Sequence, residues 1–119
     1  MRALLCLALA LPLCAAAQPL PTPLPIFDAH LHYSHDAWEL VPVPQAIEIL
    51  RKAGVKRALV SSSGDEGQQR LYQAAPDLVI PELRPYRSRG EIGTWFRDES
   101  VIPYLEERLR KFRYAGIGE

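Results

Sequence analysis

The chain has little cysteine, little glycine and no excess of charge of either sign. Its two cysteines, Cys6 and Cys14, lie near the N-terminus, so the remaining residues contain none and cannot form a disulfide. Lysine and arginine number 14 and so do aspartate and glutamate, which argues against the basic surface that a nucleic-acid partner requires. With 48% apolar residues and only seven glycines, the composition is that of a globular protein rather than a disordered one.

A long apolar run is also missing, although a short one stands at the N-terminus. Arg2 precedes the apolar stretch Ala3–Leu13, and Ala15–Ala17 then supplies the small residues that a signal peptidase reads. A membrane-spanning helix needs ~20 apolar residues, so this stretch is too short to be one. We therefore expect residues 1–17 to be a secretory signal, the mature chain to be periplasmic or secreted, and membrane contact to be limited to that signal.

Residues 18–25 are rich in proline and predict an extended linker, because each proline fixes φ and removes a backbone donor. Beyond the linker, short apolar runs alternate with segments of helical spacing. The predicted strands are 26–31, 55–62, 77–83 and 114–119, and the predicted helices are 45–53, 65–75 and 101–112. Residues 84–99 form a longer polar connection.

Three of these boundaries carry specific signals. Pro44 suits the first turn of the helix over 45–53, and Gly54 can adopt the left-handed conformation that ends it. Pro76 ends the helix over 65–75. Ser100 is predicted to be the N-cap of the helix over 101–112.

Alternation of strands and helices indicates an α/β fold with parallel strands and helical crossovers. A (β/α)8 TIM barrel takes ~250 residues, and four strands by residue 119 match the first half of one. We therefore expect residues 26–119 to form a partial barrel, the N-terminal half of a longer protein. A small open α/β sheet is the alternative.

The segment 28–32, with the sequence Asp-Ala-His-Leu-His, carries the clearest chemistry. His30 and His32 are two residues apart, so on a strand they share a face with α-carbons ~6.6 Å apart and can converge on one cation. Asp28 is placed by the same spacing on that face, as a third ligand or as an acceptor that orients a ring. The pair stands at the C-terminal end of the first strand, where barrel active sites lie. The alternative is two ordinary polar residues at a strand end.

This segment, together with Gly116–Glu119 (Gly-Ile-Gly-Glu), resembles the opening and fourth-strand motifs of the amidohydrolase superfamily. The resemblance covers residues 26–119. It implies a (β/α)8 barrel that binds one or two divalent ions, with zinc the expected metal, although manganese or iron also suit such ligands. It further implies that His30 and His32 hold one metal and that Glu119 is a ligand or a bridge between two.

By the same resemblance, the reaction is attack of metal-activated water on an amide, ester or lactone of a small-molecule substrate. The histidines that the family places on strands five and six are absent, and so is its strand-eight aspartate, the proton acceptor. The chain has only three histidines in all. A catalytic zinc takes at least three protein ligands and an open position. We therefore expect the chain by itself to be inactive, and no catalytic residue is assigned.

Weaker candidates lie just after the predicted strands. His35 and Asp36 come just after the first strand and could face a substrate, although a solvated loop is the preferred interpretation. Arg84, with Tyr86 and Arg87 close by, comes after the third strand and could bind an anionic group of a substrate; surface charge is the preferred interpretation.

Two further segments have structural explanations of equal weight. Ser61–Gly64 could bind an oxyanion through backbone N–H groups, but a turn explains it equally well. Trp95 and Phe96 are expected to cover apolar surface or to line a pocket wall.

Two other functions stay open. Phosphoesterases of the polymerase and histidinol-phosphatase type also open with Asp-x-His-x-His and can carry Ser-Asp soon after it, a pattern that Tyr33–Asp36 matches only in part. A non-catalytic exported α/β binding module without metal is the third possibility. The substrate, the number of metals and the oligomeric state are not predicted.

Overall fold

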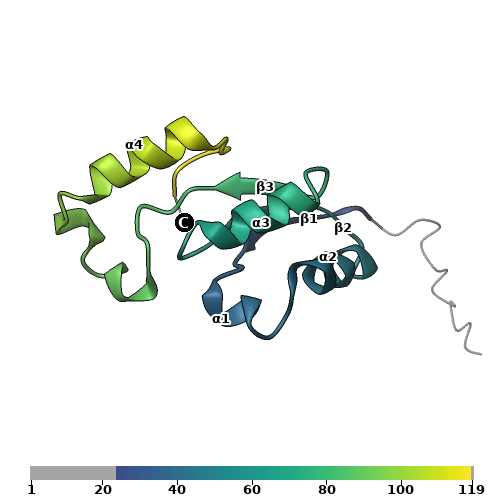
Figure 1. Cartoon of the computed structure of the whole chain (residues 1–119). Coiled ribbons are helices and arrows are strands. Elements are labelled where there is room, and N and C mark those ends of the chain that lie inside the picture. The colour runs from purple at the N-terminus through teal and green to yellow at the C-terminus, as the bar shows by residue number, and fades with distance from the viewer. Residues whose placement is uncertain (1–23, 119) are drawn as a thin grey trace, which may run out of the picture.

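The computed structural model describes residues 24–118 (Figure 1). No helix within that range is long and apolar enough to cross a membrane. The predicted signal, most of the predicted linker and Glu119 lie outside the described residues. The elements are β1 (Ile26–Leu31), α1 (His35–Trp38), α2 (Val43–Lys52), β2 (Val55–Ser61), α3 (Glu66–Ala74), β3 (Val79–Glu82), η1 (Arg89–Glu91), η2 (Trp95–Arg97) and α4 (Val101–Lys111).

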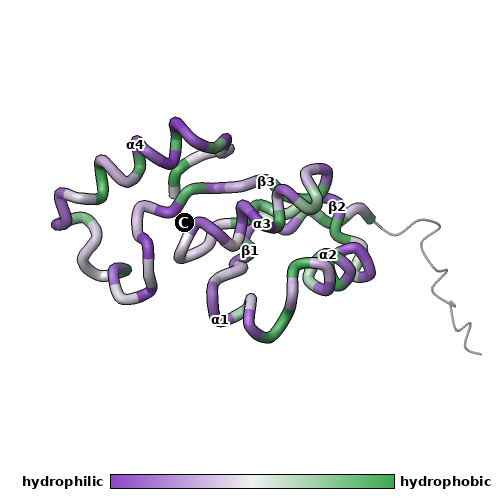
Figure 2. Tube along the Cα trace, in the orientation of Figure 1, coloured by the Kyte–Doolittle hydropathy of each residue, from purple (hydrophilic) through white to green (hydrophobic). Residues whose placement is uncertain are grey.

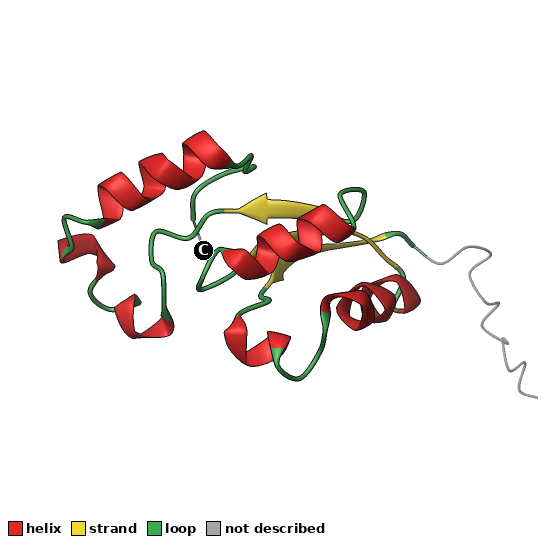
Figure 3. Cartoon of the chain, in the orientation of Figure 1, coloured by secondary structure: helices red, strands yellow, loops and turns green. Residues whose placement is uncertain are grey.

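The three strands form one parallel sheet in the order β1-β2-β3 (Figure 3). Helices connect consecutive strands, so the α/β class and the strand positions predicted from the sequence are confirmed. In β3 the proline at position 81 is tolerated and pairs with Val60 of β2.

The segment predicted as a fourth strand lies along β3 in the parallel direction. Ile117 makes a single bridge to Leu83, and the backbone N–H of Gly118 donates to the Leu83 carbonyl over 3.0 Å. Upstream, the Ala115 N–H donates to the Pro81 carbonyl over 2.8 Å. The predicted position is confirmed, but among residues 114–118 the pairing amounts to one bridge rather than a regular strand.

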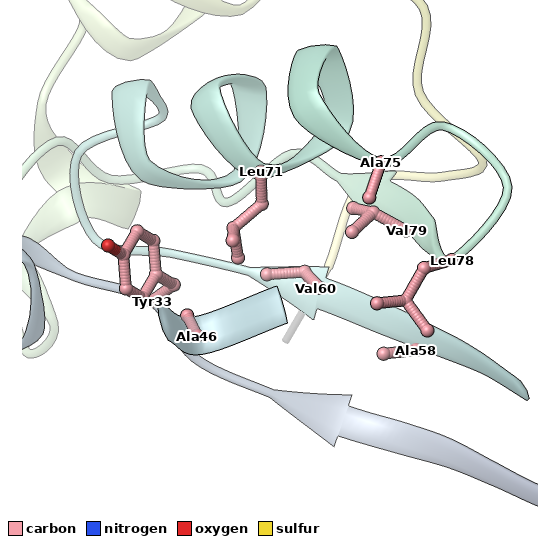
Figure 4. Close-up of a cluster of buried hydrophobic side chains, with 8 residues drawn as sticks. All are labelled: Tyr33, Ala46, Ala58, Val60, Leu71, Ala75, Leu78 and Val79. Atoms are coloured by element: carbon pink, nitrogen blue, oxygen red, sulfur yellow. The ribbon is translucent and has the colours of Figure 1, made fainter. Parts of the chain in front are cut away.

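The hydrophobic core lies between one face of the sheet and the helices. Val60 and Val79, on neighbouring strands, point toward Leu71 and Ala75 at the α3 side of the sheet (Figure 4). Ala46 of α2 joins the same cluster. Figure 2 shows apolar residues along the strands and an alternation of apolar and polar residues along the helices, as expected of amphipathic helices.

The helix α4 lies beside α3 rather than across the sheet from it. Arg108 of α4 donates from Nε to a carboxylate oxygen of Asp65, just before α3, over 2.6 Å. Gln73 of α3 and Lys111 of α4 line one pocket. The ends of α3 and α4 are therefore linked by the contact between Arg108 and Asp65.

The predicted helix ends are confirmed for α2 and corrected for α4. Gly54 has φ +83°, the left-handed conformation expected after α2. Ser100 does precede α4, but its side chain caps no backbone N–H group. Instead Asp98 accepts from the Ser100 N–H over 2.9 Å and from its hydroxyl over 2.6 Å. The predicted N-cap position of Ser100 is confirmed, but the predicted side-chain cap is absent. The Ser100 oxygen accepts from the Arg87 guanidinium over 3.0 Å while its hydroxyl donates to Asp98, and these contacts hold it away from the helix N–H groups.

Charged contacts organise the connection between β3 and α4. Arg87 donates to Glu91 through its backbone N–H over 2.7 Å and to Asp98 through its guanidinium over 2.5 Å. Trp95 lines a pocket with Tyr86, and Phe96 lines a second pocket together with Trp95 and Val101, so the predicted role in a pocket wall is confirmed for both. Phe96 remains 61% exposed.

These contacts predict a loss of stability in acid. The Arg87 N–H lowers the pKa of Glu91, and the Ser100 hydroxyl lowers the pKa of Asp98. Both carboxyls ionise more readily in the folded chain, so they stabilise it above their ordinary pKa values of about 4, and this contribution disappears as the pH falls below them. Thermal unfolding between pH 6 and pH 3 should show a smaller drop in midpoint for S100A, which removes the hydroxyl that donates to Asp98 over 2.6 Å, than for the native chain. Equal drops would contradict this assignment.

Candidate metal-binding site

Two short segments hold His32 in place at the carboxyl end of the sheet. The Tyr33 N–H donates to the Ser62 hydroxyl over 3.1 Å, and the Ser63 N–H donates to the Ser34 hydroxyl over 3.2 Å. These contacts join residues 29 positions apart and are buried. The backbone on both sides of the site is therefore rigidly connected.

The two predicted ligands are brought together. The ring centroids of His30 and His32 are 4.4 Å apart, with the ring planes at 75°. Nδ1 of His32 lies 2.6 Å from the Ser61 carbonyl oxygen. A carbonyl oxygen only accepts, so Nδ1 carries the proton and Nε2 presents its lone pair. This is the arrangement in which a metal-ligating histidine is usually fixed by its second nitrogen.

Asp28 contacts the backbone at His30. The pairing of β1 with β2 is irregular between Asp28 and Leu31, where three steps along β1 match two along β2. The shared face of Asp28 and the imidazoles, which was inferred from strict alternation, stays a prediction. Oδ1 of Asp28 accepts from the His30 backbone N–H over 3.1 Å, so the carboxylate orients the backbone at His30.

Arg84 is part of the site and is not surface charge. Only 4% of it is exposed, and a terminal guanidinium nitrogen lies 2.8 Å from Nε2 of His32 and 2.7 Å from Nδ1. Its Nε donates to the Ser61 hydroxyl over 3.4 Å, a long contact. The surface interpretation was wrong because Leu83 continues the strand by bridging to Ile117. That extended backbone directs residue 84 over the sheet rather than into solvent.

Glu82 was missed from the sequence and lies at the same end of the sheet. It is paired in register with Ser61, whose carbonyl contacts His32. An oxygen of its carboxylate is 3.5 Å from the position that a Cβ on Gly118 would take and 3.8 Å from the corresponding position on Gly116. The i, i+2 relation of Glu82 to Arg84 was the available signal in the sequence.

A surface pocket of about 410 Å³ opens beside His32. Asp36 and Arg89 line it and form an ion pair over 3.0 Å, so Asp36 faces this pocket instead of lying in a plain solvated loop. The other lining residues are Ser34, Ala37, Leu40 and Val41. This mixture of apolar and charged lining residues suits a small molecule with a polar and an apolar part.

The oxyanion site suggested for Ser61–Gly64 is not available in the form predicted. The Ser62 N–H donates to Gln68 Oε1 over 2.6 Å, and the Ser63 N–H donates to Ser34. Both donors are thus used within the protein, and the turn interpretation is the correct one for this segment.

Within residues 24–118, no group of three or more histidine, cysteine, aspartate or glutamate side chains is placed to hold a metal ion. The imidazoles of His30 and His32 fit a divalent ion as two of its ligands, with the Nδ1 hydrogen bond of His32 as the supporting observation. Glu119, predicted as a further ligand, lies outside the described residues.

No family model matches the chain, and neither a curated protein nor a solved structure matches it.

Proposed function

We propose that residues 26–119 belong to the barrel of a metal-dependent hydrolase, with His30 and His32 as two ligands of a divalent ion, zinc being the expected one. The observation that carries this is the pair of imidazoles at the carboxyl end of β1, with Nδ1 of His32 held by the Ser61 carbonyl. Because a guanidinium nitrogen of Arg84 lies 2.8 Å from Nε2, metal binding there requires that Arg84 move. The remaining ligands would come from outside residues 24–118, Glu119 being the predicted one.

The order of the elements supports a barrel. Neighbours in the sheet are neighbours in sequence, from β1 through β3 to residue 117, and Arg108 of α4 contacts Asp65 just before α3. Doubly wound open sheets reverse their strand order and carry helices on both faces, whereas barrels keep sequential order with one outer layer of helices. Barrel enzymes also place their sites at the carboxyl ends of the strands, where the two imidazoles lie.

The residues around His32 then have defined roles. The bound ion supplies an activated water for hydrolysis of an amide, ester or lactone. Ser61 fixes the tautomer of His32 through its carbonyl, and the pocket beside His32 receives the substrate. A phosphoesterase is the second candidate function, favoured by the guanidinium of Arg84, since guanidinium groups recognise phosphate as well as carboxylate.

The test is metal binding by the purified chain after dialysis against zinc or manganese. We expect the native chain to retain a divalent ion and the H30A and H32A variants to bind it at least about 100-fold more weakly, because loss of even an outer partner of a ligand costs 10–100-fold. His35, the third histidine, begins α1 and is exposed, so H35A is the matched control and should bind like the native chain. Equal metal content in all four proteins would refute the proposal.

A further inference from the structure

A second pocket, of about 180 Å³, also borders His32. Its lining is almost entirely apolar and comes from the end of β1, from α1 and α2 and from α3. It shares His32, Ala37 and Val41 with the larger pocket that Asp36 and Arg89 line. An apolar pocket and a charged pocket therefore lie next to each other, and His32 borders both.

The two polar side chains that line the apolar pocket have partners of their own. The Tyr33 hydroxyl donates to the Val41 carbonyl over 2.6 Å. Nδ1 of His32 lies 2.6 Å from the Ser61 carbonyl oxygen, and a guanidinium nitrogen of Arg84 lies 2.8 Å from Nε2. A water molecule needs two to four polar partners to be held in a cavity, so these side chains offer it little. An apolar group that displaces weakly held water gains affinity.

The walls of the apolar pocket are held by the core. Tyr33, Ala46 and Leu71 line it and belong to the buried cluster, and Figure 4 shows Tyr33 and Ala46 next to each other at one end of that cluster. A hydrogen bond over 2.6 Å from Trp38 Nε1 to the Tyr33 carbonyl fixes the first loop against them. A pocket whose walls are fixed in advance loses little free energy to ordering when a ligand binds.

The volume of the apolar pocket sets the size of its occupant. An apolar cavity of ~150 Å³ takes up benzene. A pocket of about 180 Å³ therefore accommodates a phenyl ring or a branched alkyl group. Ile49 lines the pocket with 50% of its surface exposed, so an occupant also removes apolar area from water.

We propose that this pocket is a binding site for a small apolar group, of the size of a phenyl ring, carried by a molecule whose uncharged polar part lies in the adjacent pocket beside Asp36 and Arg89. These two side chains offer a carboxylate that accepts and a guanidinium that donates, so a neutral amide, which does both, is the matching polar group. Such binding goes beyond the proposed function and needs no metal ion. His32 then lies at the junction of the two parts of the ligand.

The experiment is NMR titration of the purified chain, without added metal, with benzene, acetamide and phenylacetamide. Benzene and phenylacetamide should shift the methyl resonances of Ala46 and Leu71, which line the apolar pocket. Phenylacetamide should also shift those of Leu40, which lines the charged pocket and not the apolar one. It should bind roughly 10- to 100-fold more tightly than acetamide, the effect of burying one phenyl-sized group.

Two variants of α2 and one control locate the binding. A46L should abolish benzene binding, because the larger side chain takes the space of the ring. I49S replaces a half-exposed apolar lining residue by a polar one and should weaken benzene binding, and it keeps the test decisive where A46L does not fold. Ile102 is exposed on α4, so I102S is the matched control and should bind benzene like the native chain.

Each other outcome would overturn this assignment. Absence of methyl shifts near the solubility limit of benzene would do so, and so would shifts confined to Leu105, which lines an apolar pocket elsewhere. Equal benzene binding by the native chain and both α2 variants would place the ring outside this pocket. A dimeric native chain that I49S makes monomeric would assign the pocket to a second copy instead.

The polar part of the ligand and the proposed function are tested separately. Phenylacetamide that bound no more tightly than benzene would contradict a polar group beside Asp36 and Arg89. A chain that bound the phenyl probes as expected but no zinc would lose the proposed function and keep this binding site.

Discussion

Replacing Asp65 with alanine should destabilise the folded chain by about 3–5 kcal/mol, the usual effect of removing one partner of a buried ion pair. Only 2% of Asp65 is exposed, and its carboxylate accepts from Arg108, from the Tyr114 hydroxyl over 2.5 Å and from Gln68 Nε2 over 2.7 Å. The substitution leaves the guanidinium of Arg108 without its carboxylate in a mostly buried position.

The raised pKa values of two neighbouring tyrosines agree with the central position of Asp65. Burial raises the pKa of Tyr114, and the hydrogen bond to Asp65 raises it further. Burial also raises the pKa of Tyr104 to about 12, with the charge of Asp65 adding to the effect. The buried Asp65 carboxylate therefore links α3, α4 and the segment beside β3 through its hydrogen bonds.

Urea unfolding followed by circular dichroism gives the free energy of unfolding. The matched control is D77A, since Asp77 forms an exposed ion pair with Arg51 and should contribute no more than about 1 kcal/mol. The double variant D65L/R108M should recover most of the loss, because apolar side chains of similar volume often replace a buried ion pair without cost. If D65A lowered the free energy of unfolding by less than about 1 kcal/mol, its effect would be no larger than that of an exposed ion pair. The hydrogen bonds of Asp65 would then not hold these helices together.

The substitution Gly67→Ala should produce the second large loss of folding stability. A Cβ at this position would lie 1.8 Å from the Tyr33 carbonyl oxygen and 2.5 Å from Nε1 of Trp38. The Trp38 indole itself donates to that carbonyl over 2.6 Å, so neither atom can retreat without breaking the bond. We expect a cost of about 3 kcal/mol or more, at or above the upper end for overpacked sites.

The control for this substitution is G93A. A Cβ on Gly93 meets nothing within 4 Å, so the change should stay within about 0.5 kcal/mol. The G67A variant should also weaken metal binding, because Tyr33 comes directly after His32 and its carbonyl would be displaced. Equal stability of the two alanine variants would contradict the close approach of α3 to the first loop.

Most of the secondary structure could be predicted from the sequence, because the apolar spacing is unambiguous. Residues 26–31 and 55–62 alternate or run apolar as strands do, and Pro44 and Gly54 mark the ends of α2 correctly. Local spacing was insufficient at Asp28, where an irregular register with β2 interrupts the alternation. Such a register is set by contacts between strands, and no pattern within one strand reveals it.

The candidate site was predicted only in part, because local spacing places residues of one segment but not residues of other strands. His30 and His32 belong to one short segment, so their spacing alone brought them together. Arg84 stands 52 positions beyond His32, so its arrival beside His32 depends on sheet order and on the bridge at Leu83. Charge alone favoured the surface for Arg84, because buried arginine is rare unless a specific partner exists.

The central claim, that His32 offers Nε2 to a divalent ion while Nδ1 is held by Ser61, is tested most directly by nitrogen-15 NMR of the imidazole rings. Before zinc is added, the account predicts that His32 shows a protonated Nδ1, and on titration its Nε2 resonance shifts together with that of His30 while His35 stays unchanged. An Nε2-protonated His32, or shifts confined to His35, would contradict it.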